Sequence, residues 1–213
     1  MEKRNFCGTI GQKKVYDLKE NYQRKLDVIT SRLTEKPRLL LQSCCGPCST
    51  YVLSYLARYF EITLLYYNPN IQPQAEYDLR LEHQKKVLAA MPEVKLMECA
   101  YEGDRYVQAV KGLEKEPEGG ERCTVCFRLR LEETARLAAE GKFDYFCTTL
   151  TVSPHKDAQR INAIGKELAE QYGVAWLPAD FKKREGYKQS IALSKELELY
   201  RQDYCGCLYS KNT

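Results

Sequence analysis

Short apolar runs alternate with segments of helical period along most of this chain, and this alternation constrains the fold more than any other feature. Five runs have the length and apolar character of buried strands: residues 38–43, 61–67, 93–99, 143–149 and 174–178. Between them, apolar side chains recur every three or four residues in five segments: 49–59, 74–91, 104–113, 126–140 and 157–172. This order predicts an α/β fold, a doubly wound and mainly parallel Rossmann-like sheet with right-handed crossovers.

The segment before the first run has a helical pattern of its own. Between residues 12 and 34 apolar side chains again recur every three or four positions, and Pro37 ends the pattern because a proline disfavours helix in the residue before it. No repeat or long linker rich in Pro, Gly or Ser divides the chain. We therefore expect a single α/β domain over residues 1–213, with an N-terminal helical extension at 1–36 and the core at 38–208.

The charge distribution argues against a general nucleic-acid binder. The chain has 33 basic and 29 acidic residues, and residues 1–36 carry nine of the basic and five of the acidic ones, which accounts for the whole surplus of +4. Binding by bulk charge is therefore not expected, although local patches are able to hold one RNA. No apolar stretch reaches 18 residues and the first residues lack the apolar run of a secretory signal, so we expect a cytoplasmic protein with no membrane partner.

Ten cysteines stand against only two histidines. A chain of this length folds without disulfides or structural metal, and in a reducing compartment clustered cysteines indicate metal binding, iron-sulfur chemistry or redox catalysis. Ligands of doubly wound sheets lie beyond the carboxyl ends of the strands. Several of the cysteines stand at such positions, so we expect the site there.

The first cysteine motif is SCCGPCST, residues 43–50. Its Cys45-Gly46-Pro47-Cys48 stretch matches the thioredoxin motif between a strand and a helix, so a thiol-disulfide oxidoreductase is one open alternative. Cys44 is an extra thiol that this alternative does not use. The amino end of the following helix favours thiolates and anionic clusters.

The second motif is RCTVCF, residues 122–127, in which Cys123 and Cys126 open a helix. Coupled to Cys44 and Cys45 it provides four thiolates, the number that a cubane iron-sulfur cluster or a structural zinc requires. A zinc-stabilised RNA-binding module is therefore a second alternative. Three neighbouring arginines would offset the negative charge of such a site: Arg122, Arg128 and Arg130.

The remaining cysteines include one further pair. Cys205 and Cys207, one residue apart, are suited either to a small strained disulfide, which makes a labile redox pair, or to metal ligation. Cys7, Cys99 and Cys147 have no partner nearby in the sequence, and we expect them to be packing residues.

Several polar segments are weaker candidates. In DFKKREGY, residues 180–187, a basic run would hold RNA phosphates through Lys182, Lys183 and Arg184. The tyrosines Tyr66 and Tyr67, which end the second predicted strand, would stack on an unpaired base.

Six segments occur here in the order found in the QueH family of epoxyqueuosine reductases: SCCGPCS, YYNPNIQPQAEYDLR, CTVCFRLRLEETA, TTLTVSPHKD, DFKKREGY and YRQDYCGC. The chain resembles this family from about Arg38 to Leu208. The resemblance implies a fold of the adenine-nucleotide alpha-hydrolase type, an oxygen-sensitive iron-sulfur centre and the last step of queuosine synthesis. The implied partner is a tRNA that carries epoxyqueuosine at the anticodon wobble position.

The resemblance also implies roles for individual cysteines. It makes Cys205 and Cys207 a redox-active pair, and it implies that four others bind a 4Fe-4S cluster: Cys44, Cys45, Cys123 and Cys126. Some family members hold a single iron beside the cluster, bound by cysteines and a carboxylate. Cys48 stands at the position of that carboxylate. The resemblance therefore leaves open a second, mononuclear iron. The Cys205 and Cys207 pair would then be divided between the two centres.

The implied reaction sets its own requirements. Removing an epoxide oxygen to leave an alkene takes two electrons and two protons, whereas a cluster passes electrons singly, so a second redox element and an as yet unidentified electron donor are expected. The opening ring needs a Lewis acid or a proton donor; without a metal, the candidates are Asp180, Tyr187, Tyr204 and His155. An ATP-dependent tRNA sulfurtransferase of related fold is disfavoured because no phosphate-binding glycine loop follows the first strand.

Overall fold

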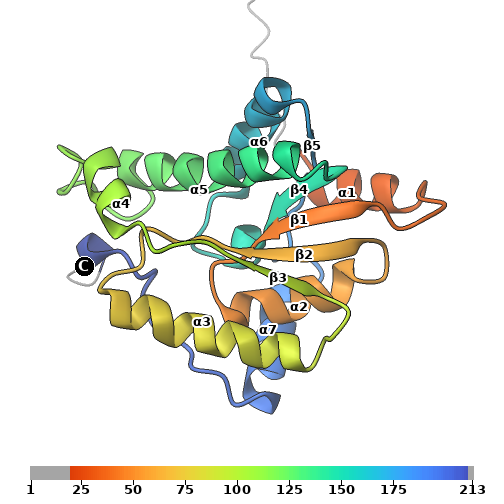
Figure 1. The fold of residues 1–213 in the computed structure, drawn as a ribbon, viewed down its shortest axis with the longest axis horizontal. Helices are drawn as coiled ribbons and strands as arrows, with labels where there is room; N and C mark the ends of the chain where they lie inside the picture. Colours follow the sequence, from red (N-terminus) through yellow and green to blue (C-terminus); the bar gives the residue numbers. More distant parts are fainter. Residues whose placement is uncertain (1–19, 211–213) are drawn as a thin grey trace, which may run out of the picture.

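The computed structural model describes residues 20–210, and a parallel sheet of five strands forms its centre. The strands lie in the order β3-β2-β1-β4-β5 and every neighbouring pair is parallel (Figure 1). Their bounds are β1 (Arg38–Gln42), β2 (Glu61–Tyr66), β3 (Lys95–Glu98), β4 (Tyr145–Thr148) and β5 (Ala175–Trp176). The order reverses direction at β1, so the predicted doubly wound α/β sheet is confirmed.

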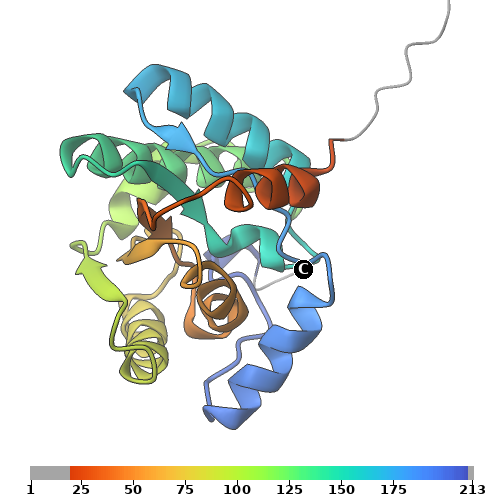
Figure 2. The same ribbon diagram turned by 90° about the vertical axis from the view of Figure 1, so that its right-hand side faces the viewer.

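Helices cover both faces of the sheet (Figures 1 and 2). On one face lie α2 (Gly46–Leu56), α3 (Gln74–Ala89) and α7 (Gly186–Glu196), and α2 packs against both of the others. On the other face α5 (Glu121–Glu140) packs against α6 (Ala158–Tyr172), and the short α4 (Gly103–Ala109) contacts α5. Two short 3-10 helices complete the described elements, η1 (Thr149–Val152) and η2 (Leu208–Ser210).

The central strand shows why the sequence of β1 is apolar without alternation. Leu39 and Leu41 pack into the core under α2 and α3, whereas Leu40 packs into the core under α5 and α6. All three leucines are completely buried. A parallel strand covered on both faces has no solvent side, so the consecutive central positions 39–41 all carry apolar residues.

The N-terminal extension is described only from residue 20. Helix α1 (Tyr22–Thr30) falls inside the predicted helix 12–34, begins after the capping residue Asn21, and buries Leu26 in the core shared with α2. The part of the predicted helix before residue 20, and Cys7 with it, lies outside the described residues.

Helix α5 begins at Glu121, earlier than the predicted start at residue 126. The first turn carries charged and polar side chains that give no apolar period, and the extended Gly120 precedes it. The pair Cys123 and Cys126 therefore lies inside the first two turns of the helix. None of the described helices is long and apolar enough to span a membrane.

Candidate functional site

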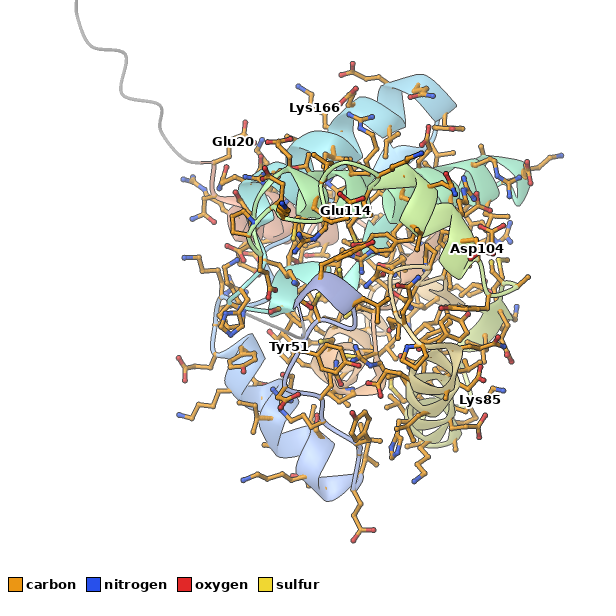
Figure 3. All side chains as sticks on the ribbon, turned by 90° about the vertical axis from the view of Figure 1, so that its left-hand side faces the viewer. Glu20, Tyr51, Lys85, Asp104, Glu114 and Lys166 are labelled. Carbon is orange, nitrogen blue, oxygen red and sulfur yellow. The ribbon has the colours of Figure 1, made fainter. Side chains whose placement is uncertain are left out.

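A cavity of about 340 Å³ lies beyond the carboxyl ends of β1, β2 and β4. Figure 3 shows the side chains with α4 and its Asp104 turned toward the reader. Lys166 of α6 lies at the top of this view and Lys85 of α3 lies near the bottom. Six cysteines from three separate segments line the cavity: Cys44 and Cys48, Cys123 and Cys126, and Cys205 and Cys207. The structure thus brings together the three motifs that the sequence keeps far apart.

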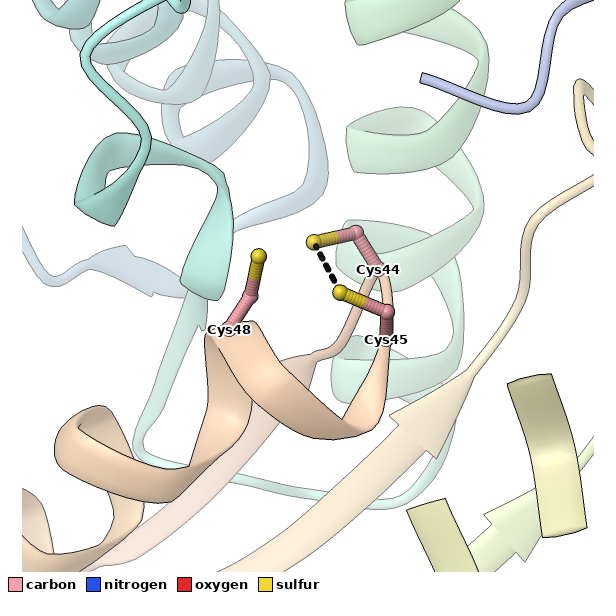
Figure 4. Close-up of side chains that lie close together, drawn as sticks. All are labelled: Cys44, Cys45 and Cys48. Atoms are coloured by element: carbon pink, nitrogen blue, oxygen red, sulfur yellow. Dashed lines mark hydrogen bonds between the residues drawn. The ribbon is translucent and has the colours of Figure 1, made fainter. Parts of the chain in front are cut away.

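The first segment forms the tightest sulfur group. The Sγ atoms of Cys44, Cys45 and Cys48 all lie within 4.8 Å of one another and turn toward the same space (Figure 4). The two adjacent sulfurs, those of Cys44 and Cys45, are 3.8 Å apart. Cys45 is extended and Pro47 occupies the first turn of α2, so the backbone turns sharply after β1 and presents three thiols within five residues.

A buried polar network fixes this turn. Gln42, at the end of β1, accepts a hydrogen bond from Thr148 Oγ1 (2.6 Å) and donates one to Asn68 Oδ1 (3.1 Å), which ties together the ends of β4, β1 and β2. Asn68 in turn donates to the carbonyl of Ser43 (2.8 Å), whose hydroxyl donates to Gln84 Oε1 on α3 (2.7 Å). Satisfied buried networks of this kind are rigid, so the cysteine turn is held in place before any ligand binds.

Hydrogen bonds between the three cysteines shift their pKa values in opposite directions. Those from Cys45 and Cys48 hold the pKa of Cys44 well below its ordinary range, and Thr149 Oγ1 also lies 3.5 Å from its sulfur. The same bond to Cys44 raises the pKa of Cys45 to about 12, and the bonds to Cys44 and Cys45 raise that of Cys48 well above its ordinary value. Without a cation, the expected state of the three cysteines is one thiolate and two thiols. A bound metal would deprotonate the other two.

Both sulfurs of the second segment accept hydrogen bonds. The backbone N–H of Gly119 donates to Cys123 Sγ (3.2 Å), and Arg130 Nη2 donates to Cys126 Sγ (3.3 Å). Burial raises the pKa of Cys126, and the positive charge of Arg130 works in the opposite direction. Both sulfurs therefore accept hydrogen bonds from groups that would also stabilise them as metal-bound thiolates.

The third segment places one thiolate beside one protonated thiol. A hydrogen bond from Cys207 lowers the pKa of Cys205 to about 5, against the effect of burial and with the help of the Lys156 charge. The same bond raises the pKa of Cys207. Cys205 Sγ lies 3.0 Å from Ser210 Oγ, and Cys207 Sγ lies 2.9 Å from the hydroxyl of Tyr106.

All nine cysteines of the described part of the chain are free thiols. The disulfide expected between Cys205 and Cys207 is therefore not supported by the structure, which shows this pair as a dithiol. Gly206 between them has a φ of +98°. A Cβ at that position would lie 2.9 Å from Ile71 Cγ1 and 3.0 Å from Arg80 Nη1, so the turn requires glycine.

The cavity wall is basic. Five arginines and lysines line it against two carboxylates, Glu118 and Asp203; the basic residues are Arg80, Arg122, Arg130, Lys156 and Arg201. Such a lining suits an anionic content, whether a thiolate-bound cluster or phosphate groups.

Comparison with known proteins settles the family. The family model described as "Epoxyqueuosine reductase QueH" matches residues 39–213. This chain belongs to the QueH family of epoxyqueuosine reductases. It is 42% identical over 200 residues to the QueH of Streptococcus pyogenes serotype M1, which covers 90% of this chain and 78% of the relative. It is likewise 42% identical over 207 residues to the QueH of Staphylococcus epidermidis (92% and 87% covered) and 38% identical over 174 residues to that of Thermotoga maritima (81% and 89%).

A solved structure shares the fold. The U34-tRNA thiolase NcsA from Methanococcus maripaludis, solved with its [4Fe-4S] cluster, superposes with a TM-score of 0.54 over 89% of this chain and 67% of the thiolase, at 16% sequence identity. At that identity the likeness shows a common fold alone. It agrees with the predicted Rossmann-like α/β fold.

The predicted RNA-binding residues of this QueH family member lie outside the cavity wall. Lys182 pairs with Asp180 (3.1 Å) and Arg184 with Asp27 (2.6 Å), whereas Lys183 is exposed. Asp180 is buried and is not among the cavity residues. The catalytic role of Asp180 and the RNA-binding role of the basic run both stay predictions. The other three proposed proton donors do line the cavity: His155, Tyr187 and Tyr204.

The expectation that Tyr66 or Tyr67 stacks on a base was wrong. Both side chains are buried in the core, where Tyr66 donates a hydrogen bond to the carbonyl of Tyr77 (3.2 Å) and Tyr67 donates one to Glu102 (2.6 Å). The strand end therefore turns its tyrosines inward. For Cys147 the packing role is confirmed, since it is 1% exposed within the core.

Sequence reasoning missed Tyr106, which is 1% exposed, lines the cavity and contacts Cys207. It falls on the apolar face of the predicted helix 104–113 and carries no motif. Only the packing of α4 against α5 brings it to the C-terminal cysteines.

Proposed function

We propose that this chain reduces epoxyqueuosine in tRNA to queuosine, using electrons from an iron-sulfur cluster held in the cysteine-lined cavity. Membership of the QueH family supports the reaction. The observation that carries the proposal is the convergence of three distant cysteine segments on one cavity with a basic wall.

The cysteines fit a 4Fe-4S cluster by number, burial and charge. The proposed ligands are Cys44, Cys45, Cys123 and Cys126, which supply the four thiolates that such a cluster takes. Cys44, Cys123 and Cys126 line the cavity, and Cys45 is completely buried next to Cys44. When bound, the cluster would supply single electrons to the substrate.

A second, mononuclear iron is proposed beside it. The mutual 4.8 Å spacing of Cys44, Cys45 and Cys48 supports this, because a cluster bound through the first two leaves Cys48 as a ligand for another ion. Cys205 lines the same cavity, and we propose it as a further ligand from the C-terminal segment because its lowered pKa favours the thiolate.

The Cys205 and Cys207 pair matches the electron demand of the reaction. The epoxide takes up two electrons and two protons to give the alkene and water. Oxidation of the dithiol to a disulfide releases two electrons and two protons, so one turnover of the pair balances one turnover of substrate. An external reductant would then regenerate the dithiol.

The remaining residues of the cavity would hold the nucleoside. A wobble nucleoside reaches such a site only when it is splayed out of the anticodon loop, and phosphate contacts hold the loop in place. Arg201 offers a cation and stacks over the ring of Tyr187 (5.6 Å to the ring centre). His155, Tyr187 and Tyr204 are the proposed proton donors to the epoxide oxygen, and Lys182, Lys183 and Arg184 the proposed phosphate contacts.

The thioredoxin-like alternative conflicts with burial. In a CxxC oxidoreductase the first cysteine attacks an external disulfide and must be reachable. That residue would be Cys45, which is 0% exposed and whose pKa is raised. For a zinc-stabilised RNA-binding module, no observation in the described residues favours zinc over iron.

Anaerobic purification followed by a turnover assay tests the proposal. We expect a brown protein that contains iron and acid-labile sulfide and that converts epoxyqueuosine-containing tRNA to queuosine-containing tRNA when a reductant is present. A colourless protein with stoichiometric zinc and no turnover would contradict it, as would a metal-free protein that reduces insulin disulfides.

A further inference from the structure

Arg130 is a buried cation in the wall of the cysteine cavity. It lies on α5 and is 4% exposed. Its guanidinium has no ion pair with a carboxylate among residues 20–210, although most other arginines of the helix have one. A buried charge without a counter-charge is unfavourable, so the neighbourhood of Arg130 must supply negative charge in the functional state.

Cysteine sulfurs, rather than carboxylates, surround the guanidinium of Arg130. Nη2 donates to Cys126 Sγ at 3.3 Å, and Nε donates to the carbonyl of Cys126 at 3.2 Å, so two contacts fix the guanidinium. It also lies over the ring of Phe127, 5.8 Å from the ring centre. Burial disfavours its charge, and the groups that offset this effect are Cys126, Cys44, Cys205 and Tyr106.

These neighbours belong to all three cysteine segments. The single fixed charge of Arg130 therefore acts on the first, the second and the C-terminal motif together.

The two other arginines near Cys126 do different work. Arg122 is buried, but its guanidinium donates to the backbone carbonyls of Leu113 and Glu114, which ties down the loop before α5. Arg128 points to the surface and pairs with Glu167 of α6. Of the three arginines predicted to offset the charge of the site, only Arg130 contacts a sulfur.

We propose that Arg130 is the counter-charge of the iron-sulfur centre. It is a positioning residue that holds Cys126 Sγ as a ligand and raises the reduction potential of the bound cluster. The reason is electrostatic: the reduced cluster carries one more negative charge, and net charge, hydrogen bonds to sulfur and burial set the potential. This inference rests on the proposed function, since it requires a cluster at this site.

The test is the midpoint potential of the cluster in anaerobically reconstituted protein, followed by EPR, together with the rate at which a chelator removes iron. The variants are Arg130→Met, which removes the charge at similar length, and Arg130→Lys, which keeps it. Arg128→Met is the matched control on the same helix. We expect Arg130→Met to reduce the ratio of reduced to oxidised cluster at a given potential at least tenfold, a downward shift of about 59 mV for one electron.

Arg130→Lys should shift the potential less than Arg130→Met, and Arg128→Met should leave it at the wild-type value. If Arg130→Met takes up no iron while Arg130→Lys does, the charge requirement is likewise supported. An unchanged potential in Arg130→Met would overturn the inference, and so would Lys and Met variants that behave alike. Wild-type protein without iron and sulfide would instead refute the proposed function, so the two failures are distinguishable.

Discussion

The hydroxyl of Tyr106 lies 2.9 Å from the sulfur of Cys207, although the two residues stand in different parts of the chain. Both are almost completely buried, at 1% and 4% exposure. Burial and the negative charge of the neighbouring cysteines raise the pKa of Tyr106, so it stays a neutral hydroxyl that is able to donate to sulfur. The contact makes Tyr106 part of the environment of the proposed redox pair.

Removing this hydroxyl should slow the reaction without unfolding the protein. In Tyr106→Phe the ring still packs, and we expect a loss of about 1 kcal/mol in the free energy of unfolding, the value of one buried hydrogen bond. Because the sulfur of reduced Cys207 would lose its hydrogen-bond partner, the reduced form of the Cys205 and Cys207 pair should become less stable. The pair should then be harder to reduce and turnover should fall. Redox titration of the pair and the turnover rate measure this. Tyr172→Phe, which removes a hydroxyl that contacts Glu132 on the surface, is the control; equal effects of both variants would show that Tyr106 has no special role.

The ionisation of Cys205 predicts a pH dependence. A hydrogen bond from Cys207 lowers its pKa from the ordinary value of 9.0 to about 5 in the folded protein. A lowered pKa stabilises the fold in full above the unfolded value, and this contribution is lost as the pH falls through the folded value. Between pH 9 and pH 5, metal-free wild type should therefore lose stability relative to Cys205→Ala.

The same ionisation is measurable directly. We expect Cys205 in metal-free protein to be alkylated by iodoacetamide at pH 6 to 7, where a cysteine with the ordinary pKa is mostly protonated. Peptide mapping identifies the modified cysteine. Alkylation that rises only above pH 8 would contradict the prediction.

Gly206 sets the position of both C-terminal cysteines. An alanine there has to adopt a φ of +98° and also meets Ile71 and Arg80 within 3.0 Å. We expect Gly206→Ala to lose about 1–3 kcal/mol of stability and most of the turnover. Gly112→Ala is a matched control, because Gly112 has a φ of +86° with nothing within 4 Å. It carries the backbone strain without the collision, so if both variants lose turnover equally, the close packing of Gly206 is not what matters.

Replacing Lys183 tests the proposed RNA contact without breaking an ion pair. Lys182 and Arg184 are held by Asp180 and Asp27, whereas Lys183 has no acidic partner in the described part of the chain. If it contacts a phosphate, Lys183→Ala should weaken tRNA binding and reduce the slope of log K against log salt by about 0.7 to 0.9. Lys95→Ala, at the amino end of the edge strand β3, should leave the slope unchanged. Affinity and slope at wild-type values in Lys183→Ala would remove this residue from the interface.

The fold was predictable because its signals are local. Residues 39–41 are three consecutive leucines, a pattern typical of a strand covered on both faces, and β1 has that environment. Element ends were less predictable. Glu121 opens α5 although its first turn has no apolar period, and β5 contains only Ala175–Trp176 of the longer apolar run.

Only those site residues that belong to sequence motifs were predictable. Cysteine spacing identified all three segments, and the rule that ligands lie at the carboxyl ends of strands predicted the place of the first two. Cys205 and Cys207 follow helix α7 rather than a strand, and that rule did not place them in the cavity. Contacts such as those of Tyr106 and Arg130 depend on how α4 and α5 pack, which leaves no local pattern. Tyr66 and Tyr67 show the opposite error: aromatic residues at a strand end were taken as stacking surfaces, whereas the core required them.

The central claim is that separate cysteine segments share one iron-sulfur centre. Iron and acid-labile sulfide per chain, measured in Cys44→Ser and Cys123→Ser after anaerobic purification, test it most directly, with Cys99→Ser as a control outside the cavity. We predict that each of the first two variants loses most of the iron and sulfide that wild type and Cys99→Ser retain. Full iron and sulfide in both Cys44→Ser and Cys123→Ser would contradict the account.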